Sequence, residues 1–405
     1  MLQNKKKPLR KYRMLDLTHM LSGPFGAMIL ADLGVETIKV EPLQGEGTRV
    51  LLANDKKNSH RGLGAYFLTL NRNKRTISID LKHKEGLALF YKLVKKSDVV
   101  LSNFGPTVPE KLKIDYAHLK KINPKIITCT VTGFGSDGPD FNRPAFDQVA
   151  QATGGGMSLT GVDESQMLRA GIPIGDLGGG MFAVMGIITA LLEREVSKRG
   201  QHVDISMLDC QIAMLNYIAT MTMLSGTDQK PIGNSHFVHV PYNSYNTKTG
   251  PIIIAVITNN FWTSLKQLLK IPELESSAYD TQPGRLQDKS KIDKLIEKHL
   301  CTNTREHWLT KLKEAKIPCA PINTISQALQ DPQVQHRNMV VDLIDKKSSK
   351  ATVKVTGNPI KFSRTPAETF SFPPDLGEDT DWVLSTILKL KKSTIAKLKS
   401  TNVVR

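Results

Sequence analysis

Cysteine is scarce in this chain, and its spacing argues against several kinds of site. The 405 residues contain four cysteines, Cys129, Cys210, Cys301 and Cys319, and no two of them form a Cys-x-x-Cys pair. This spacing argues against a zinc site and against a disulfide framework, and it fits a reducing compartment. We therefore expect no metal ion and a cytoplasmic location.

Long uninterrupted hydrophobic runs are also missing. The longest, Met181 to Leu192, is too short to span a membrane and is closed by Glu193-Arg194-Glu195. The basic segment Met1 to Arg13 lacks the apolar stretch of a secretory signal. We expect no membrane partner. The hydrophobic content of 40% is ordinary for a soluble globular protein, and the length allows two or three domains.

Positive charge is in excess: 55 Lys and Arg residues against 38 Asp and Glu residues give a net charge of +17. A basic surface can attract nucleic acid, a membrane or an anionic cofactor. The lysines are spread along the chain, with enrichment at Lys5-Lys6-Lys7 and Lys389 to Lys399, and no nucleic-acid-binding motif accompanies them. A generally basic proteome or solvated helix faces are the simplest explanation of this charge. A phosphorylated cofactor is the favoured partner, and a basic nucleic-acid-binding protein stays open as the alternative.

Short apolar strands alternate with helices along the first two hundred residues, which predicts an α/β fold with a doubly wound parallel sheet. In such sheets ligands bind beyond the carboxyl ends of the strands. Residues 1–224 form the first part of this large domain, 225–332 a smaller α+β domain, and 333–405 a tail that returns to strands and ends in a basic helix over Asp381–Leu390. One apolar helix is expected over Met207–Leu224. The expected strands of the sheet are Met14–Thr18, Glu36–Glu41, Thr76–Leu81, Asp98–Ser102, Lys125–Val131 and His202–Ser206.

A single carboxylate, Asp176, lies within the glycine-rich stretch Gly175–Gly180, at the start of a long apolar helix expected to reach Lys198. Glycine exposes backbone N–H groups there and lets a ligand or another backbone come close. Taken alone, an Asp before an apolar run is most often an N-cap. A carboxylate that a substrate can reach is the alternative, and the motifs that follow favour it.

Six short motifs, each weak alone, form a specific ordered set. In this order and spacing the chain closely resembles the family III CoA-transferases over nearly its whole length, and its middle and C-terminal parts look most like the succinyl-CoA:dicarboxylate branch. The motifs are Leu17-Thr18-His19-Met20-Leu21-Ser22-Gly23-Pro24, Ile38-Lys39-Val40-Glu41, Asn71-Arg72-Asn73-Lys74-Arg75, Asn103-Phe104-Gly105-Pro106, Thr132-Gly133-Phe134-Gly135 and Gly175-Asp176.

The resemblance implies an enzyme that moves coenzyme A between carboxylic acids. It implies an interlocked homodimer, with a Rossmann-like large domain built from both ends of each chain and a small domain from the middle. Asp176 is then the carboxylate that attacks the donor thioester, giving a mixed anhydride and afterwards an aspartyl-CoA thioester. The implied contacts to CoA are Ser22, Lys82, Asn103, Phe104, Lys111, Gly133 and Phe134.

Several of these positions have ordinary structural interpretations as well. Lys82 and Lys111 are suitable partners for phosphates but resemble surface lysines. Phe104 either stacks on adenine or packs against the sheet. The run Gly178–Gly180 either supplies N–H donors to a tetrahedral intermediate or allows close helix packing.

The chain departs from the family pattern in places. Pro42 stands where some relatives have an arginine for the nucleotide phosphate, and Arg49, Arg72 or Arg75 are possible substitutes. Only Ile232-Gly233-Asn234 matches the region where relatives carry a mobile glycine loop.

The same fold also hosts α-methylacyl-CoA racemases, which use a His and an Asp as two bases in a Gly-His-Asp motif. Here the matching residues are Ala145-Phe146-Asp147, and Phe146 cannot accept a proton. Two-base chemistry would therefore need another histidine to move in, and the candidates are His19, His236 and His239. We therefore favour the transferase over the racemase. We expect Asp147 to be a structural carboxylate near a helix start.

Overall fold

The chain divides into two units, which we describe separately. The computed structural model describes residues 7–348 and 352–405, so Lys5 and Lys6 of the basic N-terminal stretch lie outside the described residues. The larger unit combines the chain up to Gly156 with Arg169–Thr227 and Pro332–Arg405, and the smaller combines Met157–Leu168 with Asp228–Asp331.

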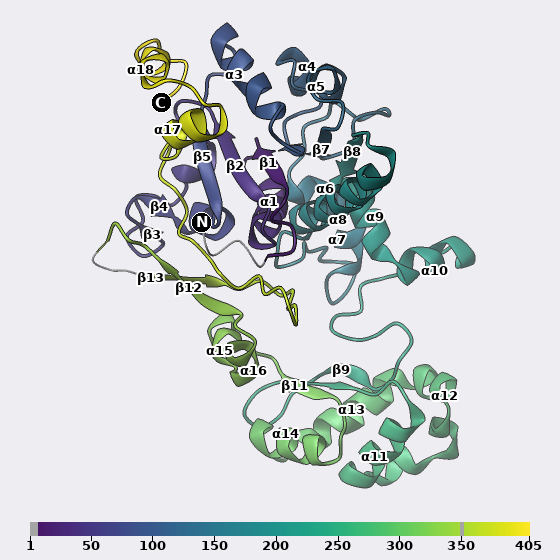
Figure 1. Ribbon diagram of the computed structural model, residues 1–405. Coiled ribbons are helices and arrows are strands. Elements are labelled where there is room, and N and C mark those ends of the chain that lie inside the picture. Colours follow the sequence, from purple (N-terminus) through teal and green to yellow (C-terminus); the bar gives the residue numbers. More distant parts are fainter. Residues whose placement is uncertain (1–6, 349–351) are drawn as a thin grey trace. The chain divides into compact units, whose positions relative to one another are not determined.

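A six-stranded parallel sheet forms the centre of the larger unit (Figure 1). Every neighbouring pair of its strands is parallel, in the order β5-β2-β1-β6-β7-β8. The chain winds outward from β1 in one direction and from β6 in the other, so β1 and β6 flank the topological switch point where such folds bind ligands. The predicted doubly wound parallel sheet is thus confirmed. The strands are β1 (Arg13–Asp16), β2 (Glu36–Glu41), β5 (Lys74–Ser78), β6 (Val99–Ser102), β7 (Ile127–Thr132) and β8 (His202–Ser206).

Both faces of this sheet are covered by helices (Figure 1). Successive residues of a strand point to opposite faces, so Met14 belongs to one core cluster and Leu15 to the other. Each fully buried side chain of this size contributes about 2 kcal/mol to folding. The Met14 side is covered by α1 (Ser22–Asp32) and α8 (Ile174–Ser197), and the Leu15 side by α3 (Lys84–Val94) and α5 (Tyr116–Ile122).

Helix α8 is the longest in the described part of the chain. By length and composition its 24 residues could cross a membrane, although the uninterrupted apolar run within it is shorter. Half of its most apolar stretch is buried within the structure. Ala183 and Ile187 are among the fully buried residues and pack in the core with strand residues of the sheet.

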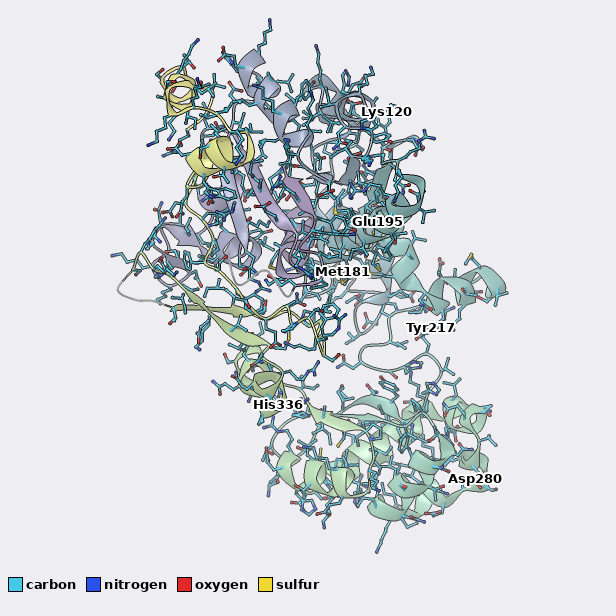
Figure 2. All side chains as sticks on the ribbon, viewed as in Figure 1. Lys120, Met181, Glu195, Tyr217, Asp280 and His336 are labelled. Atoms are coloured by element: carbon cyan, nitrogen blue, oxygen red, sulfur yellow. The ribbon has the colours of Figure 1, made fainter. Side chains whose placement is uncertain are left out.

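The apolar segment after β8 forms two helices, where the sequence predicted one. They are α9 (Met207–Leu215) and α10 (Tyr217–Ser225), and Asn216 between them has a positive φ of 53° that ends α9. None of the residues of α10 is buried, and Leu224 is 84% exposed. Figure 2 shows Tyr217 at the start of this helix.

The smaller unit has its own core beneath an antiparallel sheet. The sheet has the order β11-β10-β9, and Trp262, Ile292 and Trp308 are among the buried residues that pack beneath it. Strand β10 lies in the middle of this sheet and pairs antiparallel with β9 and β11. The elements are β9 (Tyr242–Tyr245), β10 (Ile252–Ala255), β11 (Cys319–Pro321), α11 (Asn259–Leu269), α13 (Lys289–Leu300) and α14 (Arg305–Glu314).

The C-terminal segment belongs to the larger unit and packs on its sheet. Val383, Leu384 and Val403 lie in the same core cluster as Leu15. The helix expected over Asp381–Leu390 is instead a short helix continued by a π-helical turn, and a further helix follows it. The elements are β12 (Val340–Ile344), β13 (Thr352–Thr356), α17 (Thr380–Trp382), the π turn Val383–Ile387 and α18 (Lys392–Ser400).

Candidate active site

Asp176 lies in the first turn of α8 but does not cap it. The helix begins at Ile174 and its N-cap position is Pro173, so the interpretation of Asp176 as an N-cap is wrong. The Asp176 side chain is half-buried, and no described residue donates a hydrogen bond to its carboxylate. Burial, and then the neighbouring charge of Asp147, raise the pKa of Asp176 to about 7.

The cap of α8 is supplied by Asp147, the first residue of α6 (Asp147–Thr153). One carboxylate oxygen accepts the backbone N–H groups of Gly175 at 2.8 Å and of Asp176 at 3.2 Å. The other accepts from the Gln151 amide at 2.7 Å. The prediction that Asp147 is a structural carboxylate near a helix start is confirmed. Phe146, the residue before it, is 68% exposed.

The glycines after Asp176 allow α8 to approach its neighbours closely. A Cβ at Gly179 would stand 2.6 Å from the Ser22 hydroxyl, one at Gly180 2.6 Å from the Ser22 carbonyl oxygen, and one at Gly178 2.7 Å from the Met214 methyl group. Only the N–H groups in the first turn of a helix lack an intrahelical acceptor, and in α8 these belong to Ile174, Gly175 and Asp176, since the Leu177 N–H already donates to the Pro173 carbonyl at 2.9 Å. The structure therefore supports the packing interpretation of this run, not the interpretation as a set of N–H donors.

Three of the predicted CoA contacts meet at the carboxyl ends of β1 and β6. The Asn103 amide accepts the His19 N–H at 2.9 Å and donates to the His19 carbonyl at 2.8 Å. The ring of Phe104 lies 5.4 Å from the His19 ring, and its side chain also packs against the core. Ser22 is buried, and its hydroxyl has no hydrogen-bond partner within the described structure.

Two buried lysines hold the turn that carries His19 and Ser22. Lys39 donates to the Thr18 carbonyl at 2.7 Å, and Lys74 reaches the Pro24 carbonyl at 3.3 Å and the Asp16 carboxylate at 2.9 Å. Burial lowers the pKa of Lys74 to about 8, against the opposing effect of Asp16. The lysines of two sequence motifs therefore fix both ends of one turn.

The other predicted CoA contacts also follow the carboxyl ends of strands, but within the described structure they do not contact Ser22, Asn103 or Phe104. Gly133 follows β7, and its carbonyl accepts the Leu208 N–H at 3.0 Å. The Phe134 ring lies 5.0 Å from the Arg143 guanidinium. The side chains of Lys82 and Lys111 are exposed, and no contact among the described residues joins them to Ser22, Asn103 or Phe104.

None of the three arginines considered as substitutes at Pro42 is free. Arg49 is buried and holds the Glu41 carboxylate with two bonds of 2.7 Å. Arg72 is buried against Asp32 at 2.8 Å. Arg75 pairs with Asp379 at 2.8 Å and lies over the Trp382 ring.

Tyr66, the second residue of α2 (Ala65–Leu70), is not among the predicted site residues. Burial and the charges of Asp176, Glu46 and Asp147 raise the pKa of Tyr66 to about 12. The phenol therefore keeps its proton at neutral pH, and the charge of Asp176 contributes to this. A lone tyrosine in an apolar stretch carries no sequence signal for this.

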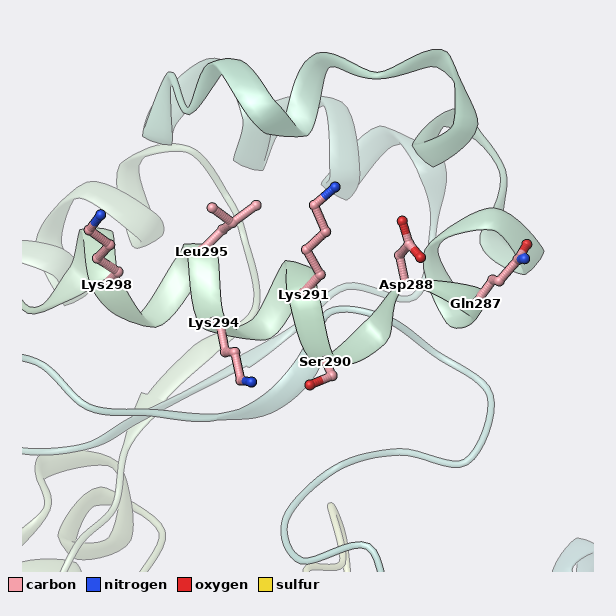
Figure 3. Close-up of a pocket in the computed structure, with 7 residues that line it drawn as sticks. All are labelled: Gln287, Asp288, Ser290, Lys291, Lys294, Leu295 and Lys298. Atoms are coloured by element: carbon pink, nitrogen blue, oxygen red, sulfur yellow. The ribbon is translucent and has the colours of Figure 1, made fainter.

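Two hollows on the described surface are lined by other residues than these. One, of about 540 Å³, lies along α13 in the smaller unit. In Figure 3 Lys291, Leu295 and Lys298 project from one side of α13 and Lys294 from the other. Another, of about 520 Å³, lies around Arg194 at the opposite edge of the sheet from the candidate site. Across residues 7–348 and 352–405, no group of three or more His, Cys, Asp and Glu side chains is arranged to hold a metal ion.

This chain and its fold have close counterparts among known proteins. CoA-transferase family III matches residues 9–380. The chain therefore belongs to CoA-transferase family III, and it is an enzyme whose substrates are CoA thioesters.

Individual relatives make the class more specific. Succinyl-CoA:glutarate CoA-transferase of Mus musculus is 31% identical over 98% of this chain and 90% of that protein. Succinate–glutarate CoA-transferase of Agrobacterium fabrum is 33% identical over 96% of this chain and 98% of that protein. A crystal structure of a CaiB/BaiF family protein from Brucella suis superposes with a TM-score of 0.83 at 32% identity, covering 94% of this chain and 99% of that one.

Proposed function

We propose that this transferase moves CoA from succinyl-CoA to a dicarboxylic acid, with Asp176 as the catalytic residue. The observation that carries the proposal is the Asp176 carboxylate itself, half-buried at the start of α8 and free of hydrogen-bond donors from the described residues. The names of the relatives, which act on glutarate in the proteins from mouse and Agrobacterium, support a dicarboxylate acceptor.

The reaction needs no water and no metal ion to balance. A carboxylate oxygen of Asp176 attacks the thioester carbon, the C–S bond breaks, and CoA thiolate leaves a mixed anhydride. The thiolate attacks the aspartyl carbon of that anhydride, which releases the donor acid and leaves an aspartyl-CoA thioester. The acceptor carboxylate then repeats both steps in reverse order and regenerates Asp176. Covalent catalysis of this kind divides one difficult exchange into easier ones.

The surroundings of Asp176 suit a carboxylate that must react. A carboxylate that accepts several hydrogen bonds is stabilised and is a weaker nucleophile, and Asp176 accepts none from the described residues. Its pKa of about 7 means that the reactive anion becomes the major form only above neutral pH. The Tyr66 phenol, whose pKa the charge of Asp176 helps to raise, stays protonated at neutral pH.

The CoA thioester is proposed to lie along the carboxyl edge of the sheet. The Ser22 hydroxyl is buried against Gly179 of α8 and has no hydrogen-bond partner among the described residues, and Asn103 and Phe104 frame the same turn. Lys82 and Lys111 are exposed cations for its phosphates, and the turn at Gly133 and Phe134 closes this edge after β7.

A second copy of the chain is the proposed partner, in an interlocked homodimer. The support is the apolar helix α10, which buries none of its residues, together with the exposed Met181 and Met185 of α8. Figure 2 labels Met181 on α8. We propose a cytoplasmic enzyme without a membrane or nucleic-acid partner. A strongly salt-dependent complex with nonspecific DNA would contradict the last point.

A mass-spectrometric assay in D2O tests the reaction type. The protein receives succinyl-CoA, a chiral 2-methylacyl-CoA and a pool of mono- and dicarboxylic acids. New CoA thioesters of dicarboxylic acids, without α-deuterium, are the expected result and identify the acceptors. Deuterium at the α-carbon without new thioesters would instead identify a racemase, with a base other than position 146.

A further inference from the structure

The last residues of the described chain run along the end of strand β5. The Asp80 N–H donates to the Val403 carbonyl at 3.0 Å, Ile79 and Val404 form an antiparallel bridge, and the Arg405 N–H donates to Ser78. Val403 and Val404 are fully buried in the core cluster that contains Leu15. The backbone of this segment is therefore fixed on the sheet.

This arrangement brings the Arg405 side chain to the ends of two neighbouring strands. One of its terminal nitrogens lies 3.5 Å from the carbonyl of Leu43, two residues after the end of β2. The side chain is exposed, and within the described structure this carbonyl is its only hydrogen-bond acceptor. A guanidinium has five N–H donors, so most of them remain available to a ligand.

Three acidic side chains of the segments next to Arg405 are already paired with other cations. Glu41 is held by Arg49, Glu378 pairs with Lys347, and Asp379 pairs with Arg75. Asp80 accepts the backbone N–H of Lys82. No described acidic side chain therefore forms an ion pair with Arg405, and Asp80 is the one acid among these four that has no cation partner.

A second cation follows the same strand. Lys82 comes two residues after Asp80, its side chain is exposed, and no described acid pairs with it. The carboxyl ends of parallel strands are where doubly wound sheets bind nucleotides. The planar guanidinium of an arginine can bind a phosphate through two parallel N–H bonds (bidentate binding), which a lysine cannot do.

We propose that Arg405 binds a phosphate of the nucleotide end of CoA, beside the ends of β2 and β5, with Lys82 as the second cation. This proposal rests on the proposed function, because it needs CoA to lie along this edge. It also replaces the expectation that Arg49, Arg72 or Arg75 does this, since all three are held in ion pairs. Arg405 supplies the guanidinium to the position beside Pro42 from the opposite end of the sequence.

Calorimetric titration with CoA and with 3′-dephospho-CoA tests this without any turnover. We expect Arg405→Gln to weaken CoA binding about 10-fold, the typical cost of losing a charge-assisted hydrogen bond, and Arg405→Lys to keep most of the affinity. The matched control is Lys397→Gln, which removes an exposed charge of α18 and should leave affinity unchanged. The melting temperature should not change in either variant, because the backbone contacts of residues 403–405 remain.

The two CoA forms identify which phosphate is bound. A loss of affinity confined to CoA supports binding of the 3′-phosphate, and an equal loss for both forms supports binding of the diphosphate. Unchanged affinity of Arg405→Gln for both forms, in a protein that binds CoA, would overturn the proposal for Arg405 alone. A wild-type protein that binds no CoA would overturn the proposed function as well.

Discussion

Two aspartates at one helix end have opposite surroundings. Asp147 accepts three hydrogen bonds, from Gly175, Asp176 and Gln151. Asp176 accepts none from the described residues, and its pKa is raised to about 7. The backbone N–H of Asp176 is itself directed to Asp147, so one carboxylate takes the donors that could have stabilised the other. Two residues of the same type therefore differ in role because their neighbours differ: Asp147 caps a helix, and Asp176 keeps a carboxylate without hydrogen bonds within the described structure.

The largest expected effect comes from removing the free carboxylate. Asp176→Asn should lower the rate of CoA transfer by about 10⁴-fold or more, because no other group can form the acyl intermediates. Initial rates with succinyl-CoA and a dicarboxylic acid measure this. Asp209→Asn is the matched control, since Asp209 is an exposed acid in the first turn of α9. Turnover by Asp176→Asn near the wild-type rate would rule out the proposed mechanism.

The raised pKa of Asp176 also makes stability depend on pH. Its folded-state pKa of about 7 exceeds the unfolded value of 3.8, so its contribution is fully present below pH 3.8 and is lost as pH rises towards 7. Between pH 5 and pH 8 this costs about 3 kcal/mol of unfolding free energy. Urea unfolding of wild type and Asp176→Asn at both pH values measures the difference. An equal loss in both proteins would show that Asp176 is not the titrating group.

Replacing the capping carboxylate of Asp147 should change both the stability of the protein and the pKa of Asp176. Asp147→Asn removes the negative charge near the α8 N–H groups and should cost about 1 kcal/mol of stability. It also removes a like charge, so the pKa of Asp176 should fall. The rise of kcat/KM with pH should then begin at a lower pH than in wild type. A stability loss with an unchanged pH profile would show that the two carboxylates are not coupled.

The smallest effect on activity is expected from a substitution at Phe146, the residue before Asp147. Phe146→His places an imidazole before Asp147, but this side chain is 68% exposed and Asp147 is occupied by its three donors. We expect no measurable exchange of the α-proton of a 2-methylacyl-CoA in D2O. Efficient deuterium incorporation by this variant would show that Asp147 can leave its capping role and act as a base.

Much of the sheet could be predicted because its strands are short apolar runs between turn residues. The bounds of β2 and β8 agree with the prediction to the residue. Strand β9 was missed because its sequence, Tyr-Asn-Ser-Tyr, is polar, and its pairing with β10 is a tertiary contact. The break at Asn216 was missed because a positive φ has no fixed sequence signal outside glycine.

The site could be predicted only in part for a similar reason. The position of Asp176 at the start of a long helix follows from local sequence. Its environment does not, because the cap comes from Asp147, which lies 29 residues earlier. The effect of Asp176 on the pKa of Tyr66 and the anchoring of Arg405 beside Leu43 likewise depend on how distant segments pack.

The two buried lysines that hold the turn of His19 and Ser22 can be used to measure how often this turn opens. The side chain of Lys39 is 1% exposed and that of Lys74 is 0% exposed, whereas other lysines of the chain, such as Lys82, are exposed. An amine-directed label will modify the exposed lysines at once and these two only when the turn opens. The delay of Lys39 and Lys74 relative to Lys82, followed by peptide mass spectrometry, therefore measures the free energy of local opening at the candidate site.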